Sequence, residues 1–586
     1  MFNLNYQIDK ANKLFEKKKY IEATEDLLKI LKKFPSNERA KKLLKKVILI
    51  NNNDEPKKNE LETLQSFIYK KDFKNLISFA TELSRKYPNY FLIYNLIGFG
   101  FENLKEYTQA ITNYKISIKL KNDFHEGYFN IGNCFFELGD FKNAQCFFEK
   151  AILYKNNYAI SFNNLGLTHR ELGNYTAAID NFKKAIFFNK DFYEAYNNLG
   201  NIYMDLNQSD KALNYYKKSF ELNPNYNDSI NNIAISLENK GNVDEASTFF
   251  QKIDNTSVNN SEIIKNLSLN QLSSFNFDEG WKNYKHRFFS RGFQIDKNIL
   301  KMPEFSLNKK FKNVFVWPEQ GLGDQILFSR FLNNLNLHGV KIYSLAHKKL
   351  EPVFKKSFHN INFVDQVNYN SFKSQIALGD LGNLFINNID DVIDSSSKYL
   401  KANYKKSIKL RSVLPKNTLL CGLSWETKSL VNASMVDQNH KKNYLSLKLE
   451  NLSKILKFPN VKFIDLQYTD TSKERKEILD KLGIDIIKLS EVDTLNNIED
   501  VVSLIDICDF IISVSNINAH IAGSLGKKTY LLLPIGRGKI WYWSKYKNSS
   551  AWYKSVEILE QKKPEDWDKV IDNLYKKILS DFKNIK

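Results

Sequence analysis

A carboxylate follows a glycine-rich turn in the second half of the chain. The motif Glu319-Gln320-Gly321-Leu322-Gly323-Asp324 lies between an apolar run that predicts a strand and a run that predicts a helix. Gly321 and Gly323 permit a tight turn and close approach of a ligand to the backbone, and the start of the helix attracts anions. A carboxylate held there can accept a proton from a nucleophile, so Asp324 is a candidate general base. The alternative is that Asp324 caps the helix.

Small polar residues follow a second predicted strand. Residues 513–526 read Ser-Val-Ser-Asn-Ile-Asn-Ala-His-Ile-Ala-Gly-Ser-Leu-Gly, so the strand ends in hydroxyl and amide groups and a helix then begins. Backbone N–H groups and hydroxyls in that arrangement suit a diphosphate. The alternative is helix capping together with a buried histidine. The candidate binding residues are Ser515, Asn516, Asn518, His520 and Gly523.

Other predicted strand ends and turns carry further candidates. Lys428 ends the segment GLSWETK and is placed to meet a phosphate, although a solvated surface lysine is the plainer reading. Gln467 and Tyr468 follow another strand and are candidates for contact with a base or sugar. Arg537 lies on a glycine-rich turn that suits an anion. With Gly321 and Gly323, these residues complete the predicted binding set.

The sequence offers no metal-ligand pattern. The eight histidines show no His-x-x-x-His spacing, and no convincing Asp-x-Asp stands at a predicted strand end. Diphosphate chemistry is therefore expected to need neither metal nor cofactor. The positive potential would come from helix N-termini, Lys428 and Arg537.

Two sets of alternating strands and helices must position these residues. Such alternation predicts parallel sheets with a ligand crevice at the carboxyl ends of their strands. We expect an N-terminal lobe over 301–400, a connection over 401–417 at a cleft, and a C-terminal lobe over 418–586. The expected strands are 311–317, 341–346 and 360–367 in the first set, and 418–425, 461–467, 484–489, 509–514 and 529–534 in the second.

The N-terminal half is a repeat array with a period of 34 residues counted from Lys57. Small residues recur at position 8 of each unit (Gly98, Gly132, Gly166, Gly200) and at position 20 (Ala110, Ala144, Ala178, Ala212). They let two helices of one unit approach closely, so that units stack. The pattern resembles the tetratricopeptide repeat, which implies a superhelix with a peptide-binding groove. We expect repeats over 4–260, including an earlier unit at 4–37, and a degenerate capping repeat with a connection over 261–300.

Asparagine stands at position 6 of five consecutive units, in a chain that holds 70 asparagines. An amide both donates and accepts hydrogen bonds, so a row of amides can grip an extended peptide backbone. The array resembles the asparagine ladder of the protein O-GlcNAc transferases. A structural bridge between repeats is an equally weighted alternative. The candidate peptide-binding residues are Asn130, Asn164, Asn198, Asn232 and Asn266.

Residues from about 275 to 575 resemble bacterial tetratricopeptide-repeat proteins fused to a heptosyltransferase-like glycosyltransferase domain. The matching segments are GWKNYKHRF, EQGLGD, GLSWE, DLQY, NINAHIAGSLG and WYKSVEIL with PEDWDKV. The resemblance implies a GT-B fold of two Rossmann-like lobes, metal-independent transfer, a nucleotide-sugar held mainly by the C-terminal lobe, and Asp324 as general base. Ser515 and Asn516 stand where heptosyltransferases carry Asp-Thr, which puts ADP-heptose as the donor in question.

The fold predicted from the sequence is thus an all-α tetratricopeptide superhelix followed by an α/β pair of GT-B type lobes. The predicted function is inverting, metal-independent glycosyl transfer from a nucleotide-sugar to a protein recruited by the repeat groove. The alternatives are a glycan acceptor of the lipopolysaccharide type and a non-catalytic interaction scaffold with a decayed transferase domain.

Composition limits the compartment and the partners. The 586 residues carry a net charge of +20, which favours anionic partners such as nucleotides and is compatible with contact at a membrane surface. No nucleic-acid-binding motif accompanies that charge, so no nucleic acid is expected. There is no apolar signal core, no run of about 18 apolar residues and no Cys-x-x-Cys pair. We therefore expect a cytoplasmic protein without a transmembrane segment.

Overall fold

The computed structural model describes residues 4–17, 19–35, 37–51, 55–206, 208–253, 261–290, 295–319, 321–395, 397–427, 446–535, 540–563 and 566–582. The contacts between residues divide the chain into two compact units, Met1–Asn223 and Pro224–Lys586.

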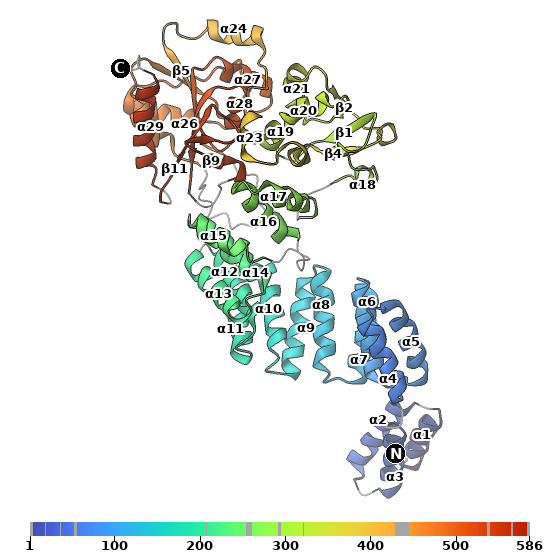
Figure 1. Cartoon of the computed structure of the whole chain (residues 1–586). Helices are drawn as coiled ribbons and strands as arrows, with labels where there is room; N and C mark the ends of the chain where they lie inside the picture. Colours follow the sequence, from blue (N-terminus) through green and yellow to red (C-terminus); the bar gives the residue numbers. More distant parts are fainter. Residues whose placement is uncertain are drawn as a thin grey trace. The chain divides into compact units, whose positions relative to one another are not determined.

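The first unit is built from helices alone in its described residues. Helices α1–α3 enclose a small core of their own, around Ile8, Leu27 and Val47. Figure 1 shows the later helices as a row of antiparallel pairs. The bounds are α1 Leu4–Glu16, α2 Tyr20–Lys33, α3 Glu38–Asn51, α4 Lys58–Tyr69, α5 Phe73–Lys86, α6 Phe91–Asn103, α7 Tyr107–Leu120, α8 His125–Glu137, α9 Phe141–Tyr154, α10 Ala159–Glu171, α11 Tyr175–Phe188, α12 Tyr193–Asp205 and α13 Ser209–Leu222.

An aromatic ring explains the glycine at position 8 of the repeats. A Cβ atom placed on Gly132 would lie 2.6 Å from the ring of Phe148, sixteen residues later on the partner helix. The same conflict arises between Gly166 and Phe182 and between Gly200 and Tyr216. In the repeat that starts at Lys57 the two sizes are exchanged. Leu64 occupies position 8, Ala80 occupies the position sixteen residues later, and both are buried. The repeat therefore conserves the combined volume of the two positions.

The second unit begins with four further helices of the repeat pattern and a short connection. These are α14 Asn227–Asn239, α15 Val243–Phe250, α16 Ser261–Ser273, α17 Phe277–Tyr284, the 3-10 turn η1 Lys285–Phe289 and α18 Lys297–Leu300. Helices α16 and α17 share a hydrophobic core with the α/β part through Leu272, Phe277 and Trp281. The division at Asn223 therefore falls inside the array 4–260 that the sequence predicts.

The N-terminal lobe holds a four-stranded parallel sheet in the order β3-β2-β1-β4. Because β4 pairs on the far side of β1, the chain direction across the sheet reverses between these two strands. The elements are β1 Asn313–Trp317, α19 Leu322–Ser329, α20 Phe331–Leu337, β2 Lys341–Ser344, α21 Glu351–Ser357, β3 Asn362–Phe363, η2 Tyr369–Ser371, β4 Gln375–Ala377, η3 Leu378–Asp380, α22 Leu381–Phe385 and α23 Ile389–Asp394.

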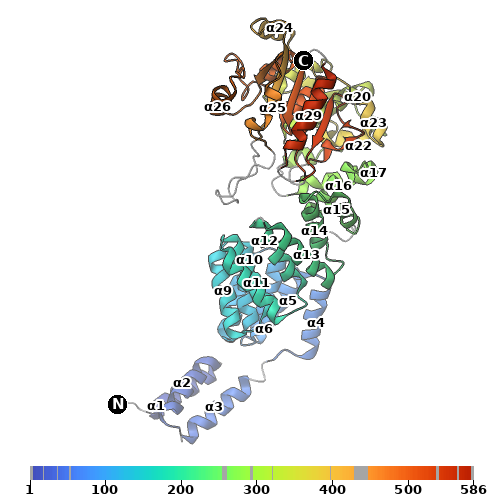
Figure 2. The ribbon, with the colours of Figure 1, turned by 90° about the vertical axis from the view of Figure 1, so that its left-hand side faces the viewer.

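The C-terminal lobe holds a seven-stranded sheet in the order β6-β5-β7-β8-β11-β10-β9. Strands β6 to β11 in this order are parallel, and β10 and β9 add an antiparallel edge. Figure 2 shows α29 against one face of this sheet. The elements are α24 Tyr404–Ser412, β5 Leu419–Ser424, η5 Leu449–Leu452, α25 Ser453–Leu456, β6 Val461–Asp465, α26 Ser472–Leu482, α27 Ile498–Asp506, β7 Phe510–Val514, α28 Ile517–Ser524, β8 Lys528–Leu533, η6 Trp541–Trp543, β9 Lys545–Tyr546, β10 Ser549–Ser550, β11 Val556–Glu560 and α29 Asp568–Asp581.

The expected order, an all-α repeat region followed by an α/β region with two mostly parallel sheets, is confirmed. Two strand predictions need correction. The run 484–489 forms only one isolated bridge, between Ile464 and Ile487, and 360–367 contributes two strand residues. Strands β4 and β11 were not expected, because β4 has only three residues and the run before β11 is aromatic and polar.

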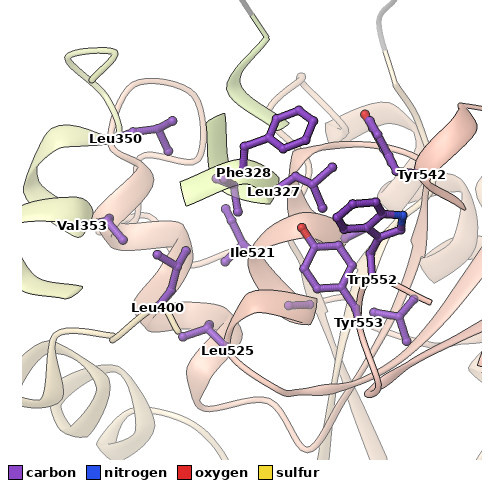
Figure 3. Packing of buried hydrophobic residues seen from close by; sticks show 14 of the residues in the cluster. Leu327, Phe328, Leu350, Val353, Leu400, Ile521, Leu525, Tyr542, Trp552 and Tyr553 are labelled. Atoms are coloured by element: carbon purple, nitrogen blue, oxygen red, sulfur yellow. The ribbon is translucent and has the colours of Figure 1, made fainter. Parts of the chain in front are cut away.

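The two lobes share one continuous core. Leu327 and Phe328 of α19 belong to the same buried cluster as Ile521 of α28 and Tyr553, and Figure 3 shows these side chains gathered between the two lobes. The expected connection 401–417 contains α24, which packs on α27. There Ser407 Oγ donates to Asp506 at 2.9 Å.

The described residues contain neither a membrane-spanning helix nor a metal-binding cluster. No described helix is both long enough and apolar enough to cross a bilayer. Within the same ranges, no group of three or more His, Cys, Asp or Glu side chains is arranged to hold a metal ion.

We expect Gly132→Ala to destabilise the first unit by about 1–3 kcal/mol, because the added methyl group overpacks against Phe148. Alanine is the better helix former, so a loss would report the ring contact. The measurement is the urea midpoint in the Phe148 and Phe148→Leu backgrounds. Leucine at position 148 is smaller than phenylalanine and should relieve the clash. An equal loss in both backgrounds would contradict this explanation.

Candidate functional site

A buried arginine fills the crevice where the N-terminal sheet reverses direction. Arg287 comes from η1, at the end of the repeat helices, and is 5% exposed. Its Nη2 donates to Glu319 Oε1 at 2.8 Å and its Nη1 to Asp380 Oδ1 at 2.7 Å. Glu319 follows β1 and Asp380 follows β4, the two strands on either side of the reversal. Ligands of open α/β sheets bind at such a point, and here the chain supplies its own cation.

Close packing locks this ion cluster in place. The Arg287 guanidinium lies 4.0 Å from the ring centroid of Tyr284 and 3.9 Å from that of Phe288. Burial lowers the pKa of Arg287, but the Glu319 and Asp380 carboxylates outweigh burial and raise the pKa above its ordinary value. Gly379 N donates to Glu319 Oε1 at 3.0 Å, and a Cβ at Gly379 would lie 2.5 Å from that oxygen. A side chain at position 379 would clash with the carboxylate of Glu319, which explains the glycine.

The second reversal point, between β5 and β7 of the C-terminal sheet, gathers several predicted residues. Ser424 ends β5 and its hydroxyl donates to Gln467 Oε1 at 2.7 Å. Asn516 Nδ2 and Asn518 Nδ2 donate to the same Ser424 oxygen at 2.8 and 3.0 Å. Asn516 also caps α28, since its Oδ1 accepts from Asn518 N at 3.0 Å. The structure therefore brings Gln467, Asn516 and Asn518 together around Ser424.

Gln467 has an unpaired donor at this point. Its side chain is fully buried, and Nε2 has no hydrogen-bond partner among the described residues. An unpaired buried donor costs about 1–3 kcal/mol. Such a group is expected where a ligand atom accepts the bond.

Lys488, which the sequence analysis did not single out, contacts the backbone of Gln467 and the carboxylate of Asp465. Lys488 Nζ lies 3.5 Å from Asp465 Oδ2 and donates to the backbone oxygen of Gln467 at 2.5 Å. Burial lowers its pKa, against the opposing effect of Asp465. Asp465 is fully buried and also accepts from Thr471 Oγ1 at 2.5 Å.

Asp324 lies between the lobes, and its carboxyl group has a pKa near neutral pH. It stands at the third position of α19, whose N-cap is Gly321, so the capping interpretation is wrong. A Cβ at Gly321 would lie 2.5 Å from Asp324 Oδ2. Burial and the charge of Glu319 raise its pKa to about 7, against a hydrogen bond from Tyr542 and the charge of Arg287.

His520 faces the same glycine loop from the C-terminal lobe. Its Nδ1 lies 2.9 Å from Tyr553 Oη, and a Cβ at Gly323 would lie 3.0 Å from its Nε2. Burial, with the charge of Arg330, lowers the pKa of His520 to about 3, so the imidazole is neutral at physiological pH. Gly523 is needed one turn later, because a Cβ there would lie 2.6 Å from Tyr553.

Arg330 is a second buried arginine, without a carboxylate partner in the described residues. It is 3% exposed, and its Nη1 and Nη2 have no hydrogen-bond partner there. The guanidinium instead lies 4.8 Å from the centroid of Tyr553, 5.1 Å from Tyr399 and 5.5 Å from Trp552. Aromatic faces compensate part of the cost of burying this charge.

The remaining predicted residues are distributed as follows. Ser515 accepts from Trp543 Nε1 at 2.9 Å and is buried, and Tyr468 is partly exposed beside Gln467. Lys428 and Arg537 lie outside the described residues. Sequence reasoning missed Arg287, Arg330, Lys488 and Tyr542. The sequence held one signal for the surroundings of Arg287. The triplet Leu-Gly-Asp of residues 322–324 recurs at 378–380, and the second copy ends in Asp380, a partner of Arg287.

The asparagine ladder bridges neighbouring repeats. Nδ2 of Asn130 donates to Asn95 at 3.1 Å, that of Asn198 to Asn163 at 3.0 Å and that of Asn266 to Asn231 at 3.2 Å. In each case position 6 of one repeat donates to position 5 of the preceding repeat.

One repeat departs from this rule. Position 5 of its predecessor is Phe129, and Asn164 donates to Asn133 at 2.9 Å instead. The bridging alternative is thus realised for these four residues, and Asn232 accepts from its neighbour Asn231 at 3.4 Å. Because one bridge uses only part of an amide, peptide binding by the ladder stays a prediction.

Between residues 125 and 226 the helical repeats match known repeat families. Models of the tetratricopeptide repeat match residues 125–158 and 193–226, and a TPR repeat model matches 166–206. The chain is thus a tetratricopeptide-repeat protein over this stretch.

Particular relatives are distant. Protein FlbA of Caulobacter vibrioides is 24% identical over 290 residues, which is 43% of this chain and 45% of FlbA, so the chain spans less than half the length of this relative. The structure of TTC0263 from Thermus thermophilus is 19% identical, with a TM-score of 0.28 over 30% of this chain and 97% of that one. YrrB, described as a TPR protein with an unusual peptide-binding site, is 21% identical, with a TM-score of 0.25 over 30% and 89%.

We expect Arg287→Met to lower the stability of the second unit by about 3–5 kcal/mol, because it leaves two buried carboxylates without their cation. Arg287→Lys should restore little, since one ammonium cannot span both carboxylates as the guanidinium fork does. The measurement is the urea midpoint followed by tryptophan fluorescence.

Lys282→Met is the matched control for this substitution. Lys282 forms exposed pairs with Asp278 and Glu279, and such pairs contribute about 0–1 kcal/mol. Equal losses in the two methionine variants would contradict a structural role for the buried cluster. Removing all three charges together should cost less than removing Arg287 alone.

We expect Asp324→Asn to stabilise the protein, and more at pH 8 than at pH 5. A carboxyl group with a pKa of about 7 in the folded chain and an ordinary pKa of 3.8 contributes stability at low pH that is lost as the pH rises towards 7. The asparagine lacks that dependence, so the gain should differ by about 2 kcal/mol between the two pH values. Thermal unfolding at each pH measures it. A gain that is independent of pH would contradict the raised pKa.

Proposed function

We propose that this chain is a glycosyltransferase of GT-B type that moves a sugar from a nucleotide-sugar donor to a protein acceptor. The observation that carries the proposal is the unpaired, buried Nε2 of Gln467 at the reversal point of the C-terminal sheet. It stands beside the start of α28, where Asn516 and Asn518 line the strand ends. A polar group of the donor would complete the hydrogen bonding of Gln467, and the diphosphate would face the positive end of the helix.

Asp324 is the proposed general base. With a pKa of about 7, it is ionised in half of the molecules at neutral pH and takes a proton without a large energetic penalty. The attacking acceptor hydroxyl would lose its proton to Asp324 as its oxygen forms the new bond to the anomeric carbon. The nucleoside diphosphate leaves from the opposite face, so the configuration inverts. Neutral His520 lies across from the glycine loop and can contribute a hydrogen bond but no charge.

Two alternative functions assign other roles to the repeats and to the N-terminal lobe. A glycan acceptor is favoured by the ladder bridges, since those amides are engaged in holding repeats together. A non-catalytic interaction scaffold is favoured by Arg287, which occupies the reversal point of the N-terminal sheet. Tetratricopeptide repeats support an interaction with a protein in either a transferase or a scaffold.

Donor binding and chemistry can be tested with two nearly isosteric variants. A panel of nucleotide-sugars should raise the thermal midpoint of the wild-type chain, because ligand binding stabilises only the native state. Gln467→Glu keeps the size of the side chain, adds a negative charge towards a diphosphate and should abolish the shift. Asp324→Asn should keep the shift and lower transfer by roughly 10²–10⁴-fold.

The pH dependence of the reaction provides an independent check on the base. Transfer by the wild-type chain should rise with pH up to a plateau above about 7, because only ionised Asp324 accepts the proton. The residual activity of Asp324→Asn should lack this rise. If no nucleotide-sugar shifts the midpoint of the wild-type chain, the scaffold alternative replaces the transferase. Transfer to glycans with none to proteins would select the glycan acceptor.

A further inference from the structure

A cavity of about 620 Å³ lies between the last repeat helices and the C-terminal lobe, within the unit Pro224–Lys586. One wall comes from α14, α15 and α16. The other comes from Ile535, from residues between Ile540 and Lys545, and from Glu560. The cavity includes neither Asp324, His520 nor any residue of the Ser424 cluster, so the proposed transfer chemistry does not use it.

Carboxylates surround an apolar floor in this cavity. Ile235, Val243, Phe250, Leu269 and Trp541 supply apolar surface, and Glu238, Asp244 and Glu560 supply three carboxylates. Lys545 is the single cation among the described lining residues, and its Nζ lies 3.3 Å from Glu560 Oε2. The described lining of the cavity is therefore negative in a chain whose net charge is +20.

Two amides of α16 also line the cavity. Asn270 is 6% exposed and its Nδ2 donates to Glu238 Oε1 at 3.3 Å and to Ser247 Oγ at 3.1 Å. Both of its N–H groups are thereby used, and its carbonyl oxygen offers acceptor capacity. Asn266, the last residue of the ladder, uses one N–H on Asn231. The amide oxygens of Asn266 and Asn270 can accept from the N–H groups of an extended backbone.

The two walls are held at a fixed separation. Gly241, at the turn between α14 and α15, has φ +86, and a Cβ there would lie 2.5 Å from Ile535 of the opposite wall. Trp541 packs edge-on against Trp281 of α17 at 5.9 Å between ring centroids. Because tight contacts join the walls on both sides, the cavity is a preformed feature of the fold.

We propose that this cavity binds a lysine or arginine side chain of an extended peptide segment from a partner protein. The apolar stem of such a side chain would lie on the aliphatic floor, and its cationic head would meet Trp541 and the carboxylates of Glu238 and Asp244. The backbone on either side would donate to Asn266 and Asn270. The cavity can be occupied whether or not the chain transfers sugars, so binding and transfer can fail separately.

The charge pattern separates this occupant from others. An anion would be repelled by the carboxylates, and an uncharged apolar ligand would desolvate them without pairing. The net charge of the whole chain opposes a basic peptide at long range. Tight binding of such a peptide therefore reports a local acidic site.

The test is fluorescence anisotropy of the full chain with a labelled Gly-Ser peptide that carries one central lysine. At low salt it should bind at least 5-fold more tightly than the same peptide with glutamine in place of lysine. Glu238→Gln with Asp244→Asn should weaken the lysine peptide by about 5- to 20-fold, the scale of two partly exposed ion pairs. Asp278→Asn with Glu279→Gln, which removes two exposed carboxylates of α17 outside the cavity, should change binding by less than 2-fold.

A variant of opposite sign keeps the test independent of folding defects. Lys545→Gln removes the cation beside Glu560 and should tighten binding of the lysine peptide. Equal binding of the lysine and glutamine peptides would overturn the proposal, as would equal losses in the two double variants. Self-association in sedimentation velocity that Glu238→Gln with Asp244→Asn abolishes would overturn it too, because the occupant would then be a second copy of this chain.

Discussion

The ion cluster of Arg287, Glu319 and Asp380 joins the end of the repeat helices to the sheet of the N-terminal lobe. Its cation comes from the end of the repeat helices, and its two anions come from the ends of β1 and β4. Because all three side chains are buried, none can separate from the others without exposing a charge to an apolar surrounding. The repeat end therefore cannot leave the sheet. The glycine loop that begins at Glu319 is held in turn, and with it Asp324. The position of the candidate base is thus fixed by a contact made outside the candidate donor site.

The same cluster influences the chemistry of Asp324 electrostatically. The negative charge of Glu319 raises the pKa of Asp324, while Arg287 lowers it. Burial is the larger cause of the raised pKa of Asp324, and these buried charges, which also hold the fold together, adjust it. Substitutions in the cluster should alter stability and the pH dependence of any reaction at Asp324 together.

Local patterns predicted the repeats and the central strands well. A period of 34 residues with small and aromatic positions is set by contacts inside one repeat, so it is visible in the sequence, as in the pairing of Gly132 with Phe148. The clustering of Gln467, Asn516 and Asn518 followed from their shared place at strand ends.

Contacts between segments that are distant in the sequence could not be predicted from local patterns. Arg287 pairs with Glu319 and Asp380 across 32 and 93 positions, and no spacing rule signals such a pair. The burial of His520 against Tyr553 likewise depends on a strand end 33 residues later. The run 484–489 is apolar enough for a strand but finds only one bridging partner, at Ile464.

The two sheets treat their reversal points in opposite ways, and this asymmetry supports a division of labour. Both sheets reverse direction beside their first strand, so both offer the crevice in which α/β proteins bind ligands. In the N-terminal lobe the guanidinium of Arg287 fills that crevice and satisfies its carboxylates. In the C-terminal lobe the buried Gln467 Nε2, at the end of the neighbouring strand β6, has no partner among the described residues. A mobile ligand is therefore expected on the C-terminal side, whereas the N-terminal side contributes a positioned carboxylate. The proposed transfer from a donor held by one lobe would require such an arrangement, because the proposed base must stay in place while donor and product exchange.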